Sequence, residues 1–336
     1  MSKATVTAPA NIAFIKYWGA RDLERAIPMN ASISMTLEHC VTQCTVETLD
    51  HGGEDEVWLA EPDGGFGTPE AEFSHRVREH LDRIRQWAGR REPVRVATRN
   101  SFPTAGGLAS SASGFAALTL AAVGAFGKKA SPRDLSLLAR RSGSGSACRS
   151  VLGGFVEWPE TKADGSDEDS YARQIADADH WDLRNIIAVV EIGPKSVPSI
   201  EGHRRAATSP YYTKRLELIP DRLDKVRRAI RERDLNALGP VIEQEAIDLH
   251  LIAMSSNPPI FYWSPGTLAV IRAVRELRQE GLAAWVTMDA GANVHVICDA
   301  DSEDDVAERL EDLSAVGFVI RDGVGPGPDD EAEHLF

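Results

Sequence analysis

The sequence predicts an α+β protein of two lobes, and three observations lead to this prediction. Strand patterns and helical patterns are mixed along the chain without strict alternation. A polar, acidic stretch at residues 161–182 separates the two halves of the chain. The length of 336 residues is enough for two domains, which we place at residues 1–184 and 185–336.

Four short segments in the first half are β-branched or alternate between apolar and polar residues, which predicts strands. These segments are residues 3–6, 41–49, 57–60 and 94–98. Thr68 followed by Pro69 is typical of a helix start, with threonine as the N-cap. The helix that follows is expected to place five apolar side chains on one face: Phe73, Val77, Leu81, Ile84 and Trp87. Ser131 followed by Pro132 predicts a second helix start of the same kind.

The second half is expected to begin with a strand at residues 186–192. Helical patterns follow at residues 216–238, 240–254 and 265–281. Strands at residues 284–288 and 293–297 flank a turn, and a last helix is expected at 302–313. The acidic run Glu303-Asp304-Asp305 suits the N-terminus of that helix because the helix dipole favours negative charge there. We therefore predict no metal site at this run.

Composition and charge exclude several classes of function. The chain has 51 acidic and 37 basic side chains, a formal net charge of −14, which disfavours binding to nucleic acid or to anionic membrane surfaces. A small anionic ligand in a locally basic pocket remains compatible with this charge. We find no apolar run of about 20 residues and no cleavable leader, so we expect a cytoplasmic protein. The four cysteines are too few for a disulfide scaffold and are expected to be reduced core residues.

The most informative segment runs from Phe102 to Gly114 and reads Phe-Pro-Thr-Ala-Gly-Gly-Leu-Ala-Ser-Ser-Ala-Ser-Gly. Glycines allow a ligand to approach the backbone closely, and serines add hydroxyl donors. A small-residue helix is expected to follow, as far as Phe126, and its N-terminus favours an anion. The segment therefore indicates a phosphate site, although a flexible linker into a packed helix would have a similar composition.

A second loop, from Arg141 to Ser150, reads Arg-Ser-Gly-Ser-Gly-Ser-Ala-Cys-Arg-Ser. Arginine binds carboxylate and phosphate through two parallel hydrogen bonds, so this loop suits an anionic substrate. The alternative is a solvated Gly/Ser loop with incidental arginines. Two serine-rich loops in one predicted domain favour the binding interpretation.

Six segments occur in an order that resembles a known family: residues 6–19, 28–34, 103–112, 143–150, 258–262 and 287–291. They include the motif Lys16-Tyr17-Trp18-Gly19, the serine loop Gly143–Ser150 and the turn Asp289-Ala290-Gly291. With these motifs the chain resembles the diphosphomevalonate decarboxylase branch of the GHMP kinase superfamily. The resemblance implies a two-lobed GHMP kinase-like fold, with a ribosomal-protein-S5-like N-terminal lobe and a ferredoxin-like C-terminal lobe. It also implies ATP-dependent phosphorylation of a tertiary alcohol, followed by loss of carbon dioxide and phosphate.

The resemblance also implies roles for individual residues. Asp289 matches the aspartate that accepts the hydroxyl proton, Lys16 matches the lysine beside it, and Arg149 matches the arginine that orients the substrate carboxylate. Further substrate-binding positions are Asn11, Tyr17, Ser144, Ser146 and Ser199. The implied ATP-binding positions are Pro103, Ala105, Gly106, Gly107, Leu108, Ala109, Ser110, Ser111 and Lys195. ATP and Mg²⁺ are the expected cofactors, a phosphorylated mevalonate is the expected small-molecule partner, and a homodimer is expected.

The clearest departure from the family is Ala20. Enzymes specific for the diphosphate usually carry lysine here, whose charge helps to hold the terminal phosphates. Without that charge, recognition of the more highly charged diphosphate is weakened. Ala20 therefore favours (R)-5-phosphomevalonate as the substrate, with isopentenyl phosphate as the product, although Arg21, Arg204 or Arg205 could compensate.

Three alternatives stay open at this point. The substrate could be the diphosphate, giving isopentenyl diphosphate. The protein could be a mevalonate 3-kinase that stops before decarboxylation. It could also be a non-catalytic sensor on the same scaffold, which the joint presence of Lys16, Arg149 and Asp289 disfavours.

Overall fold

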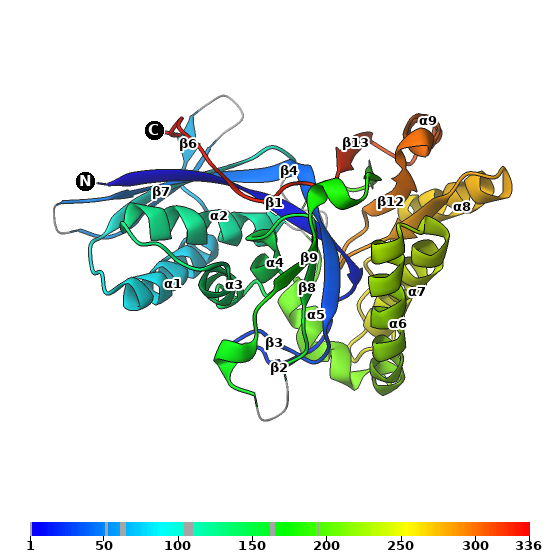
Figure 1. The fold of residues 1–336 in the computed structure, drawn as a ribbon, viewed down its shortest axis with the longest axis horizontal. Helices are drawn as coiled ribbons and strands as arrows, with labels where there is room; N and C mark the ends of the chain where they lie inside the picture. Colours follow the sequence, from blue (N-terminus) through cyan, green and yellow to red (C-terminus); the bar gives the residue numbers. More distant parts are fainter. Residues whose placement is uncertain (1, 51–52, 61–64, 104–109, 162–164, 194) are drawn as a thin grey trace.

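The fold is built on two sheets, as a computed structural model shows for residues 2–50, 53–60, 65–103, 110–161, 165–193 and 195–336 (Figure 1). The first sheet has eight strands, with a main path in the order β14-β1-β4-β7-β5-β6, and β8 and β9 extend it from β4. Its members are β1 (Lys3–Ile15), β4 (Ser32–Thr48), β5 (Glu56–Ala60), β6 (Phe66–Gly67), β7 (Val94–Asn100), β8 (Phe155–Trp158), β9 (Arg173–Ala176) and β14 (Asp329–Asp330). A short hairpin of β2 (Ala20–Asp22) and β3 (Ile27–Pro28) lies between β1 and β4 in the sequence.

The N-terminal helices lie on one side of the long strands β1, β4 and β7 (Figure 1). They are α1 (Ala71–Ala88), α2 (Ser110–Ala125), α3 (Pro132–Arg140) and the single turn α4 (Ala147–Ser150). Helix α2 is apolar on nearly every side and packs against β1 and β4, so closely that a Cβ at Gly124 would lie 3.0 Å from Ala4. An all-round apolar helix is stable only when it is buried, as α2 is here.

The second sheet has the order β11-β12-β10-β13 and is fully antiparallel. Its strands are β10 (Leu183–Val189), β11 (Ala284–Thr287), β12 (Val294–Asp299) and β13 (Phe318–Gly323). The accompanying helices are α5 (Ser199–Arg205), α6 (Tyr212–Glu232), α7 (Leu235–Met254), α8 (Pro265–Gln279) and α9 (Glu303–Glu311). Figure 1 shows α6 to α9 gathered at the end of the molecule away from α1.

A hydrophobic core joins the two sheets. It contains Phe14 and Ile33 from the first sheet, Ile187 from the second, and Leu223 and Leu238 from α6 and α7. The end of the chain also returns to the first sheet, where β14 pairs with β1 and the Glu331 N–H donates to the Thr5 carbonyl. The predicted boundary at residues 184 and 185 falls inside β10, and the predicted second domain supplies β14 to the first sheet.

Several element boundaries differ from the sequence predictions. Helix α1 starts at Ala71, after residues 66–67 have paired with β5, so Thr68 is not its N-cap. Trp87 at its far end is 39% exposed and lies off the buried face. The helix predicted at 216–238 ends at Glu232, where Arg233 is left-handed, and Asp234 caps α7. Strand β9 lies within the stretch predicted as a loop, and strands β8 and β13 were not predicted.

Other local predictions are confirmed. Ser131 is the N-cap of α3, its side chain accepts from the Asp134 N–H, and Pro132 is the first helical residue. The acidic run Glu303-Asp304-Asp305 forms the first turn of α9. All four cysteines are buried and unpaired. Among the described helices, none combines the length and apolar character needed to cross a bilayer.

Candidate active site

The centre of the candidate site is an ion pair between the two lobes. Lys16 directly follows β1, and Asp289 lies in the turn between β11 and β12. The Lys16 Nζ donates to Asp289 Oδ1 at 2.8 Å. The lysine side chain is 1% exposed, whereas the aspartate side chain is 28% exposed, so the carboxylate is the accessible partner. The pair therefore presents a carboxylate that a ligand can reach, backed by a buried ammonium.

The surroundings of this pair set its charges. Burial raises the pKa of the Asp289 carboxyl, but the Lys16 ammonium outweighs burial and holds that pKa below its ordinary value. Burial lowers the pKa of Lys16, and the Asp289 carboxylate opposes this. The Asp289 carboxyl is therefore ionised at neutral pH, and the charged form of each group favours the charged form of the other.

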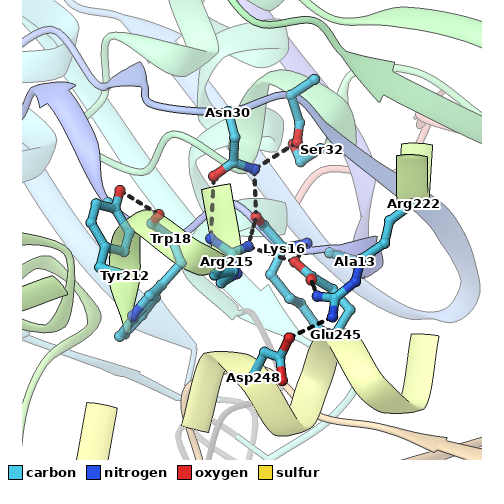
Figure 2. A network of polar contacts seen from close by, with 12 residues as sticks. Ala13, Lys16, Trp18, Asn30, Ser32, Tyr212, Arg215, Arg222, Glu245 and Asp248 are labelled. Atoms are coloured by element: carbon cyan, nitrogen blue, oxygen red, sulfur yellow. Dashed lines mark hydrogen bonds and ion pairs between the residues drawn. The ribbon is translucent and has the colours of Figure 1, made fainter. Parts of the chain in front are cut away.

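The backbone of Lys16 is fixed by side chains from both lobes (Figure 2). Its N–H donates to Glu245 Oε1 at 3.1 Å, and its carbonyl accepts from Arg215 Nη2 at 2.8 Å and from Asn30 Nδ2 at 3.0 Å. Arg215, on α6, and Glu245, on α7, are themselves paired at 2.5 Å and almost wholly buried. The clamp (Asn30, Arg215 and Glu245) therefore holds Lys16 where its ammonium meets Asp289.

A second arginine extends the clamp towards solvent. Arg222, seven residues after Arg215 and on the same face of α6, donates to the other carboxylate oxygen of Glu245 and to Asp248 on α7 (Figure 2). Two cations thus surround the fully buried Glu245. A buried carboxylate is tolerated when it is paired and hydrogen-bonded, as this one is.

Arg149, on α4, is 2% exposed, and its charge acts on both Lys16 and Asp289. Its guanidinium donates to Asn11 Oδ1 at 3.0 Å, to Ser34 Oγ at 2.9 Å and to Ser32 Oγ at 2.6 Å. These acceptors are neutral, and within the described chain no carboxylate lies at ion-pair distance from Arg149. Asn11 in turn donates to Ser150 Oγ at 2.8 Å, so its amide holds the arginine in place.

The remaining predicted substrate residues line the serine loop and its neighbours. The Oγ atoms of Ser144 and Ser111 are hydrogen-bonded at 3.2 Å, so the serine loop contacts the first turn of α2. Ser146 is partly exposed and makes no side-chain cap to α4. Tyr17 packs against Trp158, with ring centroids 4.8 Å apart, and a Cβ at Gly145 would strike its ring. This close approach accounts for glycine at position 145.

Lys195 and Ser199 form a third group. The Lys195 Nζ donates to Ser199 Oγ at 3.0 Å, and burial lowers its pKa while the Asp289 carboxylate opposes this. No described carboxylate lies at ion-pair distance from Lys195. Three cations, Lys16, Arg149 and Lys195, therefore act on the single carboxylate of Asp289. The site is electropositive within an acidic chain and suits an anionic substrate.

The predicted phosphate loop is described only at its ends. Pro103 precedes it, and Ser110 and Ser111 open α2, whose N-terminus offers free N–H groups to an anion. Ala105, Gly106, Gly107, Leu108 and Ala109 lie outside the described residues. The described residues contain no group of three His, Cys, Asp or Glu side chains able to hold a metal. A Mg²⁺ ion bound together with a nucleotide usually takes only one or two protein oxygens besides phosphates and water, so it would not need such a group.

The sequence analysis missed the clamp residues Arg215 and Glu245. Glu245 did leave a signal, since it lies on the buried face of α7 between Ile242 and Leu249. A charged residue on an apolar helix face is informative because burial requires a partner. His250 is also buried, and it lies against Tyr262, Trp263 and the Asp289 backbone.

Comparison with known proteins shows which family the chain belongs to. The model of the diphosphomevalonate decarboxylase-like N-terminal domain matches residues 8–172. The model of the mevalonate 5-diphosphate decarboxylase C-terminal domain matches residues 185–318. The chain belongs to the diphosphomevalonate decarboxylase family. As a family member it is an ATP-dependent decarboxylase, and the expected two-lobed GHMP kinase-like fold is confirmed.

Individual family members match over nearly the whole chain. Diphosphomevalonate decarboxylase from Homo sapiens is 39% identical over 324 residues, which cover 92% of this chain and 79% of the human protein. The structure of mevalonate diphosphate decarboxylase from Staphylococcus aureus has a TM-score of 0.90 at 34% identity and 98% coverage of both chains. A structure described as MDDEF in complex with MVAPP, AMPPCP and magnesium has a TM-score of 0.89 at 37% identity, covering 98% of this chain and 99% of the other. That complex agrees with the ATP and Mg²⁺ expected from the sequence.

Proposed function

We propose that this chain phosphorylates the 3-hydroxyl of a 5-phosphorylated mevalonate with ATP and then releases carbon dioxide and phosphate, leaving an alkene. The observation that carries the proposal is the partly exposed carboxylate of Asp289, on which three described cations act. One carboxylate serves one proton, and the surplus positive charge suits a substrate that bears both a carboxylate and a phosphate.

Each group has a part in this reaction. Asp289 accepts the proton of the substrate hydroxyl, and Lys16 keeps that carboxylate ionised and faces the developing charge. Arg149, held by Asn11, Ser32 and Ser34, orients the substrate carboxylate that leaves as carbon dioxide. ATP with Mg²⁺ supplies the phosphoryl group and neutralises charge on its phosphates. Ser110 and Ser111 offer hydroxyls to those phosphates at the start of α2.

Two substrates remain, and different observations favour them. The relatives and solved structures described above are named for the diphosphate, so the comparisons favour diphosphomevalonate. The residues around position 20 favour the monophosphate. Ala20 carries no charge, and Arg21 bonds the Thr161 carbonyl at 2.8 Å and pairs with Glu160 at 3.5 Å.

The other two arginines that could replace the missing lysine are also paired. Arg204 and Arg205 both contact Glu201 on their own helix. The three arginines that could replace the missing lysine, Arg21, Arg204 and Arg205, therefore all have acidic partners. On this ground we propose (R)-5-phosphomevalonate as the preferred substrate, giving isopentenyl phosphate, with the diphosphate as the second candidate.

The test supplies ATP, Mg²⁺ and carboxyl-labelled substrate, as monophosphate and diphosphate separately, and counts labelled carbon dioxide against ADP. We expect equal amounts of both products, with a higher kcat/KM for the monophosphate. A higher kcat/KM for the diphosphate would select the second candidate. ADP without carbon dioxide would make the protein a 3-kinase and overturn the proposal.

The Ala20→Lys variant tests the discriminator. We expect it to raise kcat/KM for the diphosphate relative to the monophosphate, since an ammonium adds attraction that grows with phosphate charge. Lys214→Met is a control for the change of one surface charge, because Lys214 is 71% exposed and pairs with Glu217. If the ratio of kcat/KM for the diphosphate to kcat/KM for the monophosphate is unchanged in Ala20→Lys, Ala20 does not determine the substrate preference.

A further inference from the structure

His203, on α5, lies against residues 17–19, which directly precede Ala20 at the start of β2. Its ring packs on Tyr17 and Trp18, with centroid separations of 4.2 Å and 4.9 Å. Its Nδ1 accepts a hydrogen bond from the Gly19 N–H at 3.0 Å. The contact is tight, because a Cβ at the neighbouring Gly202 would strike the Trp18 ring. The imidazole is therefore fixed in position and in rotation.

The contact to Gly19 also fixes the tautomer. A backbone N–H always donates, so Nδ1 must hold a lone pair. Burial, together with the nearby Arg215 and Lys195, lowers the pKa of His203 to about 3, which keeps the ring neutral. A neutral imidazole with an unprotonated Nδ1 carries its proton on Nε2. Among the residues that the structure describes, none is hydrogen-bonded to Nε2, so its N–H is available to a ligand.

The contacts of His203 indicate which part of a substrate would meet this donor. The ring packs on Tyr17 and Trp18 and bonds the Gly19 N–H, and these three residues directly precede Ala20. The proposed function assigns position 20 to the end of the substrate that carries the 5-phosphate.

We infer that the Nε2–H of His203 donates to a 5-phosphate oxygen and is a specificity-determining contact of this enzyme. The inference rests on the proposed function. A neutral donor orients one phosphate oxygen without adding positive charge. It therefore increases the affinity for a diphosphate, relative to a monophosphate, less than an ammonium would. With Ala20 in place of a lysine, the substrate phosphate would meet a neutral hydrogen-bond donor from His203 and no ammonium at position 20.

Two substitutions separate this role from a structural one. In His203→Asn, the side-chain oxygen can take the place of Nδ1 and accept from Gly19, but no atom reaches the position of Nε2. In His203→Gln, the amide N–H reaches the position of Nε2, but the acceptor for Gly19 is lost. A substrate donor predicts that Gln is the better replacement, whereas a purely structural acceptor predicts that Asn is.

We expect His203→Asn to raise KM for the phosphorylated mevalonate about 10- to 100-fold, the scale of one hydrogen bond to a charged group, with KM for ATP unchanged. His203→Gln should recover most of this loss. His39→Asn, at an exposed histidine, is the control and should match the parent enzyme. An unchanged substrate KM in His203→Asn, or a larger loss in His203→Gln, would overturn the inference.

The test of His203 does not depend on whether the enzyme prefers the monophosphate or the diphosphate. Both carry a 5-phosphate, so if the parent enzyme prefers the diphosphate, His203→Asn should still raise KM for the diphosphate. If the parent enzyme releases no carbon dioxide, the proposed function fails, and calorimetric binding of (R)-5-phosphomevalonate to parent, Asn and Gln variants decides the role of His203. Equal affinities of the parent and the Asn variant would then overturn it.

Discussion

At the scale of residues, Lys16 and Asp289 control each other's charge. Burial alone would raise the pKa of the Asp289 carboxyl, and the Lys16 ammonium at 2.8 Å reverses this. The proposed proton acceptor is therefore in its ionised form at neutral pH, as a general base must be.

Lys16→Met should shift the acid limb of the pH profile upward. Without the ammonium, only weaker effects such as those of His295 and Arg149 oppose burial, so the pKa of Asp289 rises and protonation removes the base at a higher pH than in the parent enzyme. The measurement is kcat/KM of the residual activity against pH, with Lys214→Met as the control for loss of one exposed charge. An acid limb at the parent position would mean that Lys16 does not set this pKa.

Residues of the site could be predicted when a motif carries them. Lys16, Arg149 and Asp289 come from three distant motifs, and the structure brings Lys16 and Asp289 into contact with Arg149 nearby. Arg215 and His203 could not be predicted, because their partners are backbone atoms of residues 16 and 19, almost 200 positions away. Such pairings arise from packing, which local patterns do not encode.

At the scale of elements, helices α6 and α7 hold the end of strand β1. Register shifts in β1 between Pro9 and Asn11 and between Ala13 and Ile15 precede the site, and bulges of this kind re-aim side chains. Tyr212 on α6 adds a bond from its hydroxyl to the Trp18 carbonyl at 3.1 Å (Figure 2). Contacts from helices α6 and α7 thus fix the path of residues 16–18, which follow β1.

Glu245→Gln should lower both stability and kcat. It removes one charge from a buried pair and leaves Arg215 without its carboxylate, a change that typically costs about 3–5 kcal/mol. It also weakens the acceptor of the Lys16 N–H, so kcat should fall more than KM changes. Thermal unfolding and steady-state kinetics below the Tm are the measurements.

Asp248→Asn is the matched control for this clamp. Asp248 is on the same helix and contacts Arg222, but it makes no bond to Lys16. We expect near-parental kcat in this variant. An equal loss of kcat in Asp248→Asn and Glu245→Gln would show that general destabilisation, not the hold on Lys16, causes the effect.

Helix starts were predicted correctly where a local capping residue sets them, and incorrectly where strand pairing with a distant segment sets them. Ser131 caps α3 as predicted, because its side chain satisfies an N–H three residues later. Thr68 fails as a cap because residues 66–67 first pair with β5 and the chain must leave the sheet before α1 begins. The predicted helix at 216–238 crossed the break at Arg233, where Asp234 was the overlooked N-cap.

At the scale of the whole molecule, the two lobes share one core and meet at the site. A chain of net charge −14 concentrates three cations around one carboxylate, which gives an anionic substrate a local attraction in an otherwise repulsive field. The homodimer and the cytoplasmic location stay predictions from the sequence, and light scattering of the purified protein tests the first.

Deleting residues 329–336 should lower the Tm while leaving the KM values unchanged. The segment supplies β14 and the bonds from Glu331 and Leu335 to Thr5 and Thr45, each worth about 1 kcal/mol. It contacts the start of β1, far along the strand from Lys16. An unchanged Tm would show that the returning chain end does not stabilise the first sheet.

The central claim is that Asp289 takes the hydroxyl proton in an ATP-dependent decarboxylation, and Asp289→Asn tests it most directly. ADP and labelled carbon dioxide are counted together with (R)-5-phosphomevalonate, and ATP affinity is measured separately. The account predicts that both products fall together by about 10²- to 10⁴-fold while ATP affinity stays near that of the parent enzyme. Turnover close to the parent rate in Asp289→Asn would contradict the account.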